Sequence, residues 1–345
     1  VERLLYDDVS DLIERNDKRI AEKYTHIKDE LFMMHNLAIR LSKLRHDRGS
    51  LDFDLDEAYI TLDENGIPSG IGIAQRRSAN KLIEEFMLLA NETVAEHFYW
   101  METPFVYRVH EKPAADKVEQ LRIFLKGFGI TLRGNADGIH PKAICSVLDS
   151  AKGKPGEDVV NSVTLRSMQK AFYSTSCEGH FGLALKYYCH FTSPIRRYPD
   201  LMIHRIIKQS IHEGLSDKAL KHFRKKAEYA ADQSSIAERK AVEAEREVEK
   251  LKKAEYISYH VGEIFDGVIS GVTGFGIYVQ LENTVEGLVR IDELRDDYYD
   301  YHKEKYALEG RRTGNVYRLG DEVRVIVDHV DLEKHEIDFL IAGHL

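Results

Sequence analysis

The sequence has few cysteines, no long apolar run and no excess of basic residues. Its cysteines, Cys145, Cys177 and Cys189, are scattered and form no CxxC pair, so their spacing indicates neither a disulfide framework nor a zinc site. No segment approaches the roughly 18 consecutive apolar residues of a membrane-spanning helix. The N-terminus VERLLYDDVSDLIERNDKR is too charged for a signal peptide. These absences predict a cytoplasmic protein in a reducing compartment, with no membrane partner.

The charge balance does not favour a nucleic-acid binder. There are 49 Lys and Arg residues against 58 Asp and Glu, a net charge of −9, whereas such proteins usually carry a basic face. Local patches steer ligands and the total charge does not, so this class is not excluded. The length of 345 residues and the 43% hydrophobic content predict about two folded domains. Because the chain starts with Val1 rather than Met, we expect a fragment or a processed product.

The first part of the chain, residues 1 to about 212, mixes helix and strand patterns. Apolar residues recur at helical spacing in 26–45 and in 81–100, which predicts two long helices. The segment between them alternates as strands do, and Asn65 with Gly66 is typical of a hairpin turn.

The second and third parts differ from it. Residues 216–256, rich in Ala, Glu, Lys and Arg, predict a long solvated helix that acts as a connecting arm. From residue 259 to 345 short alternating strands with Gly turns predict a small antiparallel barrel of the OB type. We interpret the tyrosine-rich insert 295–312 as a polar loop rather than an extension of the barrel surface. The whole is an α+β chain.

The segment CHFTSPIRRYPDLMIHR carries two adjacent arginines in a stiff frame. Pro194 and Pro199 restrict the backbone around Arg196 and Arg197, and a helix-competent run follows in which Asp200 complements the helix dipole. Guanidinium groups beside a helix N-terminus suit a phosphate or a phosphodiester. The alternative is that one arginine pairs with a buried carboxylate while the other is solvated.

Several longer segments carry a family resemblance. LRSMQKAFYSTSCEGHFGLALKYYCHFTSPIRRYPDLMIHR (165–205) resembles the signature region of the RNase II/RNase R (RNB) family of exoribonucleases, and GSLDFDLDEA, IEEFMLLANETVAEHF and YRVHEKP resemble its flanking segments. The RNase R branch is the most similar. The resemblance implies that 1–258 is the C-terminal portion of an RNB catalytic domain, a partial mixed α/β domain with its helical arm at 216–256, and that 259–345 is an S1 RNA-binding domain.

The family activity that this implies is processive 3′-to-5′ hydrolysis of RNA to nucleoside 5′-monophosphates with Mg²⁺. A DxxxxxDxDD cluster holds the metal in the family, and it is absent from this sequence. Asp52, Asp54 and Asp56 alternate on one strand face, but their segment matches base contact rather than metal binding. We therefore expect the Mg²⁺ ligands in a segment N-terminal to this chain, no metal ligand within it, and no activity from the chain alone.

The resemblance assigns roles around the scissile phosphate. Arg196 matches the arginine that contacts this phosphate and stabilises charge building on phosphorus. Arg197 and Tyr198 would position that turn or the terminal phosphates. Glu85 matches a glutamate near the ribose of the penultimate nucleotide, although Glu84 leaves the register open by one.

Further RNA contacts are implied along the chain. Phe53 would stack on a base and Glu245 would touch RNA from the arm, with core packing and a solvated charge as the respective alternatives. In the barrel the expected contacts are the aromatic platforms Phe265, Phe275 and Tyr278, and Arg290, which stands where many S1 domains have histidine.

The expected partners are the 3′ end of single-stranded RNA and the missing N-terminal segment, in an enzyme that is monomeric when complete. A non-catalytic RNA-binding module built on a degenerate RNB domain is the alternative function.

Overall fold

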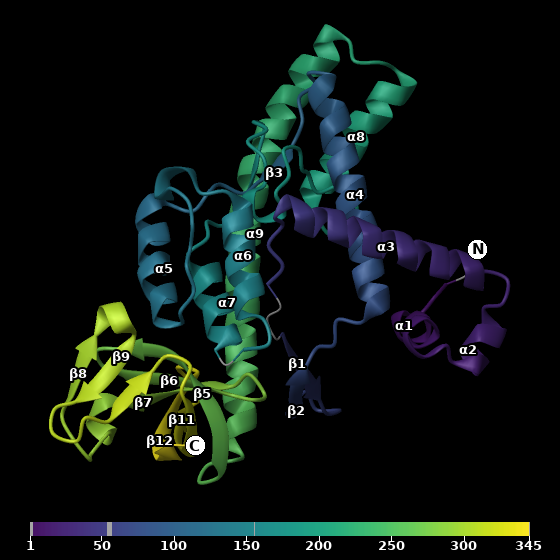
Figure 1. Cartoon of the computed structure of the whole chain (residues 1–345). Coiled ribbons are helices and arrows are strands. Elements are labelled where there is room, and N and C mark those ends of the chain that lie inside the picture. Colours follow the sequence, from purple (N-terminus) through teal and green to yellow (C-terminus); the bar gives the residue numbers. More distant parts are fainter. Residues whose placement is uncertain (1–2, 54–56, 155, 345) are drawn as a thin grey trace.

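The computed structural model describes residues 3–53, 57–154 and 156–344. A helical body lies beside a small β-barrel, and one long helix runs from the far end of the body down to the barrel (Figure 1). The predicted α+β class is confirmed. Within those three ranges no helix combines the length and the apolar character needed to cross a membrane.

The α-helices are described first, in chain order. They are α1 (Tyr6–Arg15), α2 (Lys18–Lys23), α3 (Lys28–Arg48), α4 (Ser78–Trp100), α5 (Ala115–Gly127), α6 (Pro141–Ala151), α7 (Glu157–Arg166), α8 (Tyr198–His212) and α9 (Asp217–Ser258). The two long helices predicted from periodicity correspond to α3 and α4, and the arm corresponds to α9. Local signals set their ends. Ser216 accepts a hydrogen bond from the amide of Ala219 at the start of α9, and Gly49, whose φ of 101° suits glycine, caps the C-terminal end of α3.

The strands belong to hairpins and to the barrel. They are β1 (Ala58–Leu62), β2 (Pro68–Ile73), β3 (Tyr107–Val109), β4 (Phe172–Ser174), β5 (Ile264–Thr273), β6 (Gly276–Leu281), β7 (Glu286–Arg290), β8 (Tyr299–His302), β9 (Ala307–Gly310), β10 (Val316–Arg318), β11 (Glu322–Asp331) and β12 (Glu336–His344). The predicted hairpin turn is confirmed between β1 and β2, where the Asp63 carboxylate accepts the amides of Asn65 and Ile67.

The predicted barrel is also confirmed. Its strands close in the order β11-β12-β7-β6-β5, with β12 parallel to β7 and the other pairs antiparallel. Alternate residues point inward and are fully buried, as period-2 strands require: Ile269, Ile277, Val279, Val289, Val323, Val325 and Val327. Gly287 is needed in β7 because a Cβ there would lie 2.6 Å from the ring of Phe339.

The prediction of a polar loop at 295–312 is wrong. This insert forms β8 and β9, and β9 pairs with both β8 and β10 in a three-stranded sheet. Tyr299 and Tyr317 are buried against each other with ring centroids 5.4 Å apart, and the Asp297 carboxylate accepts the amides of Arg312 and Thr313 at 2.7 and 2.6 Å. The sequence pattern did not show that Asp297 would accept backbone amides of a turn fifteen and sixteen residues further along the chain.

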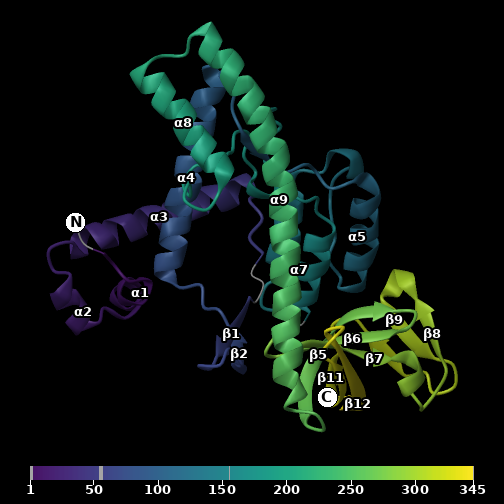
Figure 2. The same ribbon diagram turned by 180° about the vertical axis from the view of Figure 1, so that it is seen from behind.

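Apolar contacts join the barrel to the helical body. Phe124 of α5 meets the ring of Tyr306 edge-on at 5.3 Å, and the Cα of Gly320 approaches Val159 of α7 so closely that a Cβ would lie 3.0 Å from it. From behind, α9 is seen to pass along the body and end against the barrel (Figure 2). The two parts therefore share one continuous apolar core.

A second core lies in the part of the helical body farther from the barrel, where α8 and α9 pack on α4 and on the β3–β4 pair (Figure 1). Met202, Ile203 and Ile206 of α8 are fully buried, and each such side chain contributes about 1.5–3 kcal/mol of burial free energy. Ala227 and Ala230 let α9 approach closely. This core fixes the start of α8, and with it the turn that carries Arg196 and Arg197.

Candidate nucleic-acid interface and phosphate site

The turn that precedes α8 has the predicted form. The amides of Arg196 and Arg197 both donate to the carbonyl of Ser193, at 3.3 and 3.1 Å, and Pro199 lies in the first turn of the helix. A proline there has no amide to leave unpaired, and its fixed torsion matches the helix. The sequence therefore determines both the turn and the helix that follows it.

The two arginines of the turn have different environments. Asp200 is fully buried, and its Oδ1 accepts from Arg197 Nη2 and from the amide of Ser193, each at 2.7 Å. Arg196 is exposed, and none of the described residues forms an ion pair or a side-chain hydrogen bond with it. The turn therefore has the arrangement that the sequence analysis gave as the alternative: one arginine pairs with a buried carboxylate, and the other is exposed to solvent. It leaves Arg196 available to an external anion and gives Arg197 a contact that holds the turn.

The neighbouring side chains show what the turn presents to solvent. Ile195 is completely exposed and Tyr198 is 44% exposed. Tyr198 is the first residue of α8, and the free amides of a helix N-terminus favour an anion.

Partly buried aromatic groups and a buried asparagine pack next to the turn. His204 of α8 stacks on Phe191 with centroids 4.4 Å apart, and its Nε2 lies 2.9 Å from the Phe191 carbonyl. Asn91 of α4 accepts the Phe191 amide at 2.9 Å. The sequence analysis missed Asn91 and His204. The signal that could have found each of them is a polar side chain among the apolar positions of a predicted helix.

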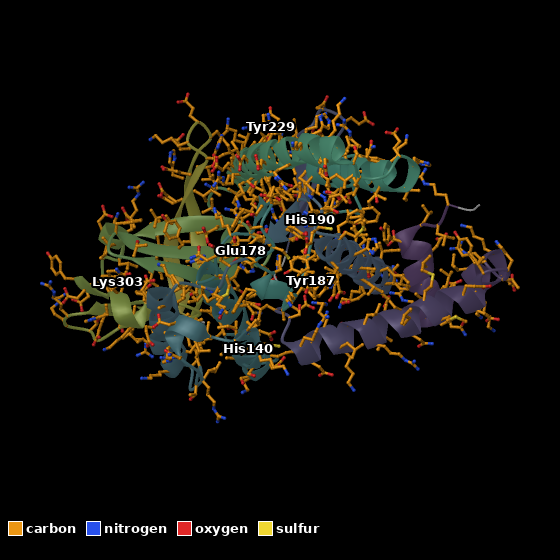
Figure 3. The ribbon with its side chains drawn as sticks, turned by 90° about the horizontal axis from the view of Figure 1, so that it is seen from above. His140, Glu178, Tyr187, His190, Tyr229 and Lys303 are labelled. Carbon is orange, nitrogen blue, oxygen red and sulfur yellow. The ribbon has the colours of Figure 1, made fainter. Side chains whose placement is uncertain are left out.

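His190 lies beneath the same turn, near the centre of the molecule in Figure 3. Its Nδ1 is 2.9 Å from the hydroxyl of Tyr173. Burial, together with the charges of Arg197 and Arg108, lowers the pKa of His190 to about 2. The imidazole is therefore neutral at physiological pH and acts as a structural hydrogen-bonding group rather than as a proton carrier.

The two adjacent glutamates of α4 are placed differently. Glu85 is buried and accepts Arg45 Nη2 at 2.7 Å, while Arg45 also donates to Ser50 Oγ at 2.9 Å. Glu84 is partly exposed and pairs with Arg76. The glutamate that the resemblance assigns to the ribose is thus held inside by an arginine, and its neighbour faces solvent.

Phe53 and Asp52 lie beside this cluster. Phe53 is half-buried and packs against the main apolar core, as its alternative interpretation expected. Asp52 contacts Arg76 at 3.3 Å and Arg45 at 3.7 Å, so it is a counter-ion of two arginines. Asp54 and Asp56 lie outside the described residues.

The described residues do not fit the magnesium centre of the family. Magnesium prefers carboxylate oxygens and water. In the described ranges the one group of at least three side chains that could together hold a metal is His46, Cys145 and Asp149, whose thiol and imidazole are poor magnesium ligands. No step involving magnesium is therefore derived from this chain.

The barrel brings three of its four expected RNA contacts together. Phe275 is 55% exposed and meets Tyr278 edge-on at 6.2 Å, and Gly276 pairs with Arg290 on the adjacent strand. Arg290 is half-exposed and donates to Asp338 at 3.3 Å. Phe265 lies towards the other end of β5, half-buried, with its ring edge against His260.

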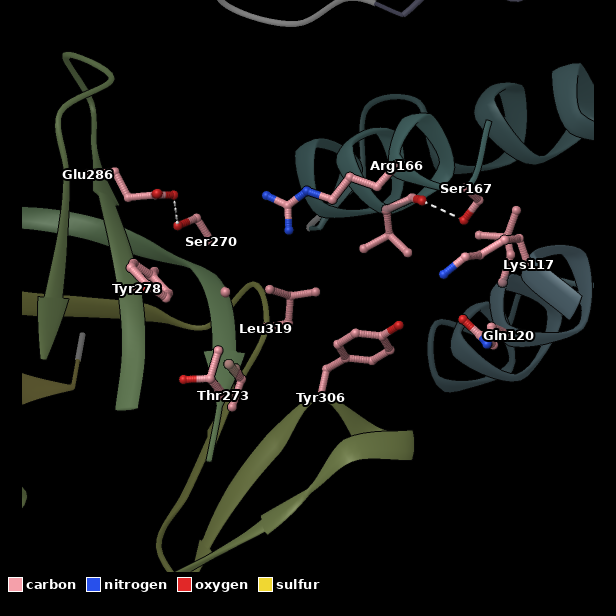
Figure 4. A pocket seen from close by; sticks show the side chains of 14 residues that line it. Lys117, Gln120, Arg166, Ser167, Ser270, Thr273, Tyr278, Glu286, Tyr306 and Leu319 are labelled. Carbon is pink, nitrogen blue, oxygen red and sulfur yellow. Dashed lines mark hydrogen bonds between the residues drawn. The ribbon is translucent and has the colours of Figure 1, made fainter. Parts of the chain in front are cut away.

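A cavity of about 340 Å³ lies at the seam between body and barrel. Lys117 of α5 and Arg166 of α7 extend towards it from the body, and Tyr278 and Tyr306 line it from the barrel side (Figure 4). Both cations are exposed and neither has an ion-pair partner among the described residues. The sequence analysis missed them, because only the folded chain places them opposite an aromatic platform.

The arm carries Glu245, which is exposed and forms no ion pair within the described part of the chain. Its surroundings show a solvated helix face rather than a closed site, so the structure leaves its predicted RNA contact untested.

The sequence matches two known domain families and several curated proteins. Residues 1–213 match the model of the RNB domain, and residues 258–342 match that of the S1 RNA binding domain. The chain is 45% identical to ribonuclease R 1 of Lactococcus lactis over 339 residues, which cover 98% of this chain and 41% of that protein. It is 42% identical to ribonuclease R of Aquifex aeolicus, covering 99% of this chain and 48% of that protein.

A solved structure agrees with the fold. Mycoplasma genitalium RNase R in complex with ribose-methylated single-stranded RNA superposes with a TM-score of 0.88 at 30% identity, covering 97% of this chain and 52% of that one. The chain spans about half the length of the curated relatives it matches. By the match of residues 1–213, which include the segment around Arg196, the chain belongs to the RNB family.

Proposed function

We propose that this chain supplies the phosphate-contacting turn and the RNA path of a processive 3′-to-5′ exoribonuclease that releases nucleoside 5′-monophosphates. The observation that carries the proposal is Arg196, an exposed guanidinium on a rigid turn that no described side chain pairs with, in a chain whose first 213 residues match the RNB domain. The similar Mycoplasma genitalium protein was solved with single-stranded RNA, which supports RNA as the substrate class. We assign residues 1–258 to the catalytic part and 259–345 to the S1 domain.

The arginine acts by stabilising developing charge. A phosphodiester under attack gathers negative charge on its non-bridging oxygens, and a donor that is already positioned needs no reorganisation as that charge forms. Arg197, held by Asp200, and the stacked pair of Phe191 and His204 keep the turn in place. Tyr198 lies at the same helix end and is close enough in sequence to share the anion.

RNA upstream of its 3′ end would lie on the barrel. Bases stack on Phe275 and Tyr278 without sequence preference, as a processive enzyme requires. Lys117 and Arg166, which pair with no carboxylate in the described part of the chain, line the same cavity as Tyr278 and would neutralise phosphates where the strand crosses from barrel to body. The net charge of −9 is thereby reconciled with RNA binding, because the cations that matter are local.

We further propose that magnesium ligands come from a segment outside this chain, since Asp52 is occupied by arginines and the remaining described ligands suit a different metal. The isolated chain is then expected to bind single-stranded RNA without degrading it. Supplying the N-terminal segment as a second chain should restore magnesium-dependent release of monophosphates. A cytoplasmic location and a monomeric complete enzyme stay predictions.

The test is Arg196→Ala in the complete enzyme, with Arg40→Ala, an exposed arginine on α3, as the matched control. Single-turnover cleavage should slow by about 100- to 1000-fold while the Kd for RNA changes much less, because the contact strengthens in the transition state. Equal losses of binding and rate would refute the assigned role.

The isolated chain tests where the metal site lies, and the complete enzyme tests the alternative function. Labelled RNA incubated with the purified chain and Mg²⁺ should remain intact. Robust cleavage that disappears when Asp52, Asp54 and Asp56 are changed to Asn would place the metal site within this chain. A complete enzyme that binds RNA and never cleaves it would instead favour the non-catalytic RNA-binding module.

A further inference from the structure

Three potential metal ligands of different chemical types meet where the end of α3 lies against α6. Cys145 Sγ is 3.8 Å from His46 Nδ1 and 3.9 Å from Asp149 Oδ2, and His46 Nε2 is 3.4 Å from Asp149 Oδ2. Cys145 and Asp149 are four residues apart on α6 and share one helix face. His46 comes from α3, 99 positions earlier in the chain.

The separations resemble those in a zinc site. Tetrahedral bonds of about 2.3 Å to sulfur and about 2.0 Å to nitrogen or oxygen put sulfur about 3.5 Å from the other ligands, and nitrogen about 3.3 Å from oxygen. The cluster is open by only a few tenths of an ångström relative to these values. His46 faces each partner with a different ring nitrogen, and because its side chain is 53% exposed the ring is free to turn one nitrogen towards both.

We propose that His46, Cys145 and Asp149 bind one zinc-class divalent cation that links the end of α3 to α6. Thiolate and imidazole select Zn²⁺ over Mg²⁺, and three protein ligands leave a fourth position for water. An adjoining cavity of about 390 Å³, which all three residues line, provides room for that water.

The backbone around the site is held in place without the metal. Gly49, just after α3, touches the start of α6 so closely that a Cβ would lie 2.7 Å from the amide nitrogen of Lys142. Two residues later the amide of Leu51 donates to the carbonyl of Gly182 at 2.7 Å. A cation therefore meets ligands on two packed helices and does not have to gather them from a loop.

The charges near the site allow a dication to bind. Arg45, a buried cation that lines the same cavity, is neutralised by Glu85 at 2.7 Å and by Asp52 at 3.7 Å. The cavity lining also holds Lys43, Lys152 and Glu157. Of the ligands, the carboxylate of Asp149 and the thiolate that forms on binding supply two negative charges.

A nucleophilic cysteine is the competing interpretation of the same trio. Burial and the neighbouring Asp149 raise the pKa of Cys145, whereas a reactive thiol requires a lowered one. The cavity therefore holds a neutral thiol until a metal displaces its proton.

The experiment uses the purified chain after removal of metals with a chelator. Titration with Co²⁺ should give thiolate-to-cobalt absorption that saturates at one ion per chain and disappears when Zn²⁺ is added, while Mg²⁺ has no effect. Cys145→Ser should abolish the absorption, and Asp149→Asn should weaken Co²⁺ binding by about 100-fold or more. Cys177→Ser, which removes a partly exposed thiol elsewhere, should leave the titration unchanged.

Stability gives a second readout that is independent of nuclease activity and of the proposed function. Saturating Zn²⁺ should raise the Tm of the wild-type chain by roughly 5 °C and that of the Cys145→Ser variant by much less. Absence of thiolate-to-cobalt absorption at saturating Co²⁺, or absorption that survives Cys145→Ser, would overturn the proposal and leave the trio as a hydrogen-bonded cluster.

Discussion

Replacing Asp200 with Asn tests whether the turn of Arg196 is held by a buried charge. Asp200 has no solvent exposure and accepts two hydrogen bonds of 2.7 Å, one from the Arg197 guanidinium and one from the amide of Ser193. Asn keeps the shape of the side chain and one acceptor oxygen, so packing changes little. What the substitution removes is the counter-charge of Arg197.

The expected cost is large. Breaking a buried ion pair from one side costs about 3–5 kcal/mol. The Arg197 side chain is 19% exposed and one acceptor oxygen remains, which places the expected loss at the lower end, about 3 kcal/mol. At roughly 2–4 °C per kcal/mol, the Tm should fall by about 6–12 °C.

Chemical denaturation and thermal melting measure this loss, with Asp217→Asn as the matched control. Asp217 is also an aspartate in the first turn of a helix, but it is exposed, so only its helix-dipole contribution of about 0.3–1 kcal/mol is at risk. In the double variant with Arg197→Ala the cost of Asp200→Asn should shrink by at least about 1 kcal/mol, because the orphaned cation is gone. Equal stability of the two Asn variants would refute the reasoning.

The remaining predictions concern other parts of the chain. Because the pKa of His190 is lowered to about 2 in the folded chain, the unfolded chain gains a proton on this residue below about pH 6.5 and the folded chain does not. The free energy of unfolding should therefore fall by about 1 kcal/mol between about pH 7 and about pH 5.5. Urea titrations at several pH values measure this fall, and His190→Gln should reduce it. Glu85→Ala removes the 2.7 Å partner of the buried Arg45 guanidinium and leaves it only the 3.7 Å contact with Asp52, so it should cost about 3 kcal/mol in denaturation. The partly exposed Glu84→Ala should cost less than about 1 kcal/mol, and similar costs would contradict the assignment. Phe275→Ala should weaken single-stranded RNA binding by about 1–3 kcal/mol in fluorescence titrations with an unchanged salt slope, whereas a changed slope would mean that phosphate contacts were lost as well.

The packing of the barrel against the helical body determines how its role in RNA binding can be tested. Its core is continuous with that of α5–α7 through Phe124 and Tyr306, so deletion of 259–345 would expose apolar surface as well as remove RNA contacts. Point changes on the barrel face separate the two effects. No sequence pattern indicated that the barrel packs against α5–α7. The strands of an S1 domain can be recognised from their own sequence, and that sequence does not show which other elements they contact.

Much of the secondary structure follows from local sequence. The helices predicted at 26–45 and 81–100, the arm at 216–256 and the Asn65–Gly66 turn all appear, since helical periodicity, caps and turn residues act over a few positions. The insert 295–312 was mispredicted because its sheet depends on Asp297 accepting amides fifteen and sixteen residues away. Such a contact leaves no local pattern.

The sequence by itself determined that Arg196 and Arg197 stand in a stiff turn before a helix, because prolines and the helix start are local constraints. Which arginine is free was decided by the fold. Packing of α8 buries Asp200 completely, and a buried carboxylate takes the guanidinium that can reach it, leaving Arg196 exposed. Tertiary structure likewise brings His46 to Cys145 and places Arg166 opposite Tyr278, since contacts between distant segments exist only after the chain has folded.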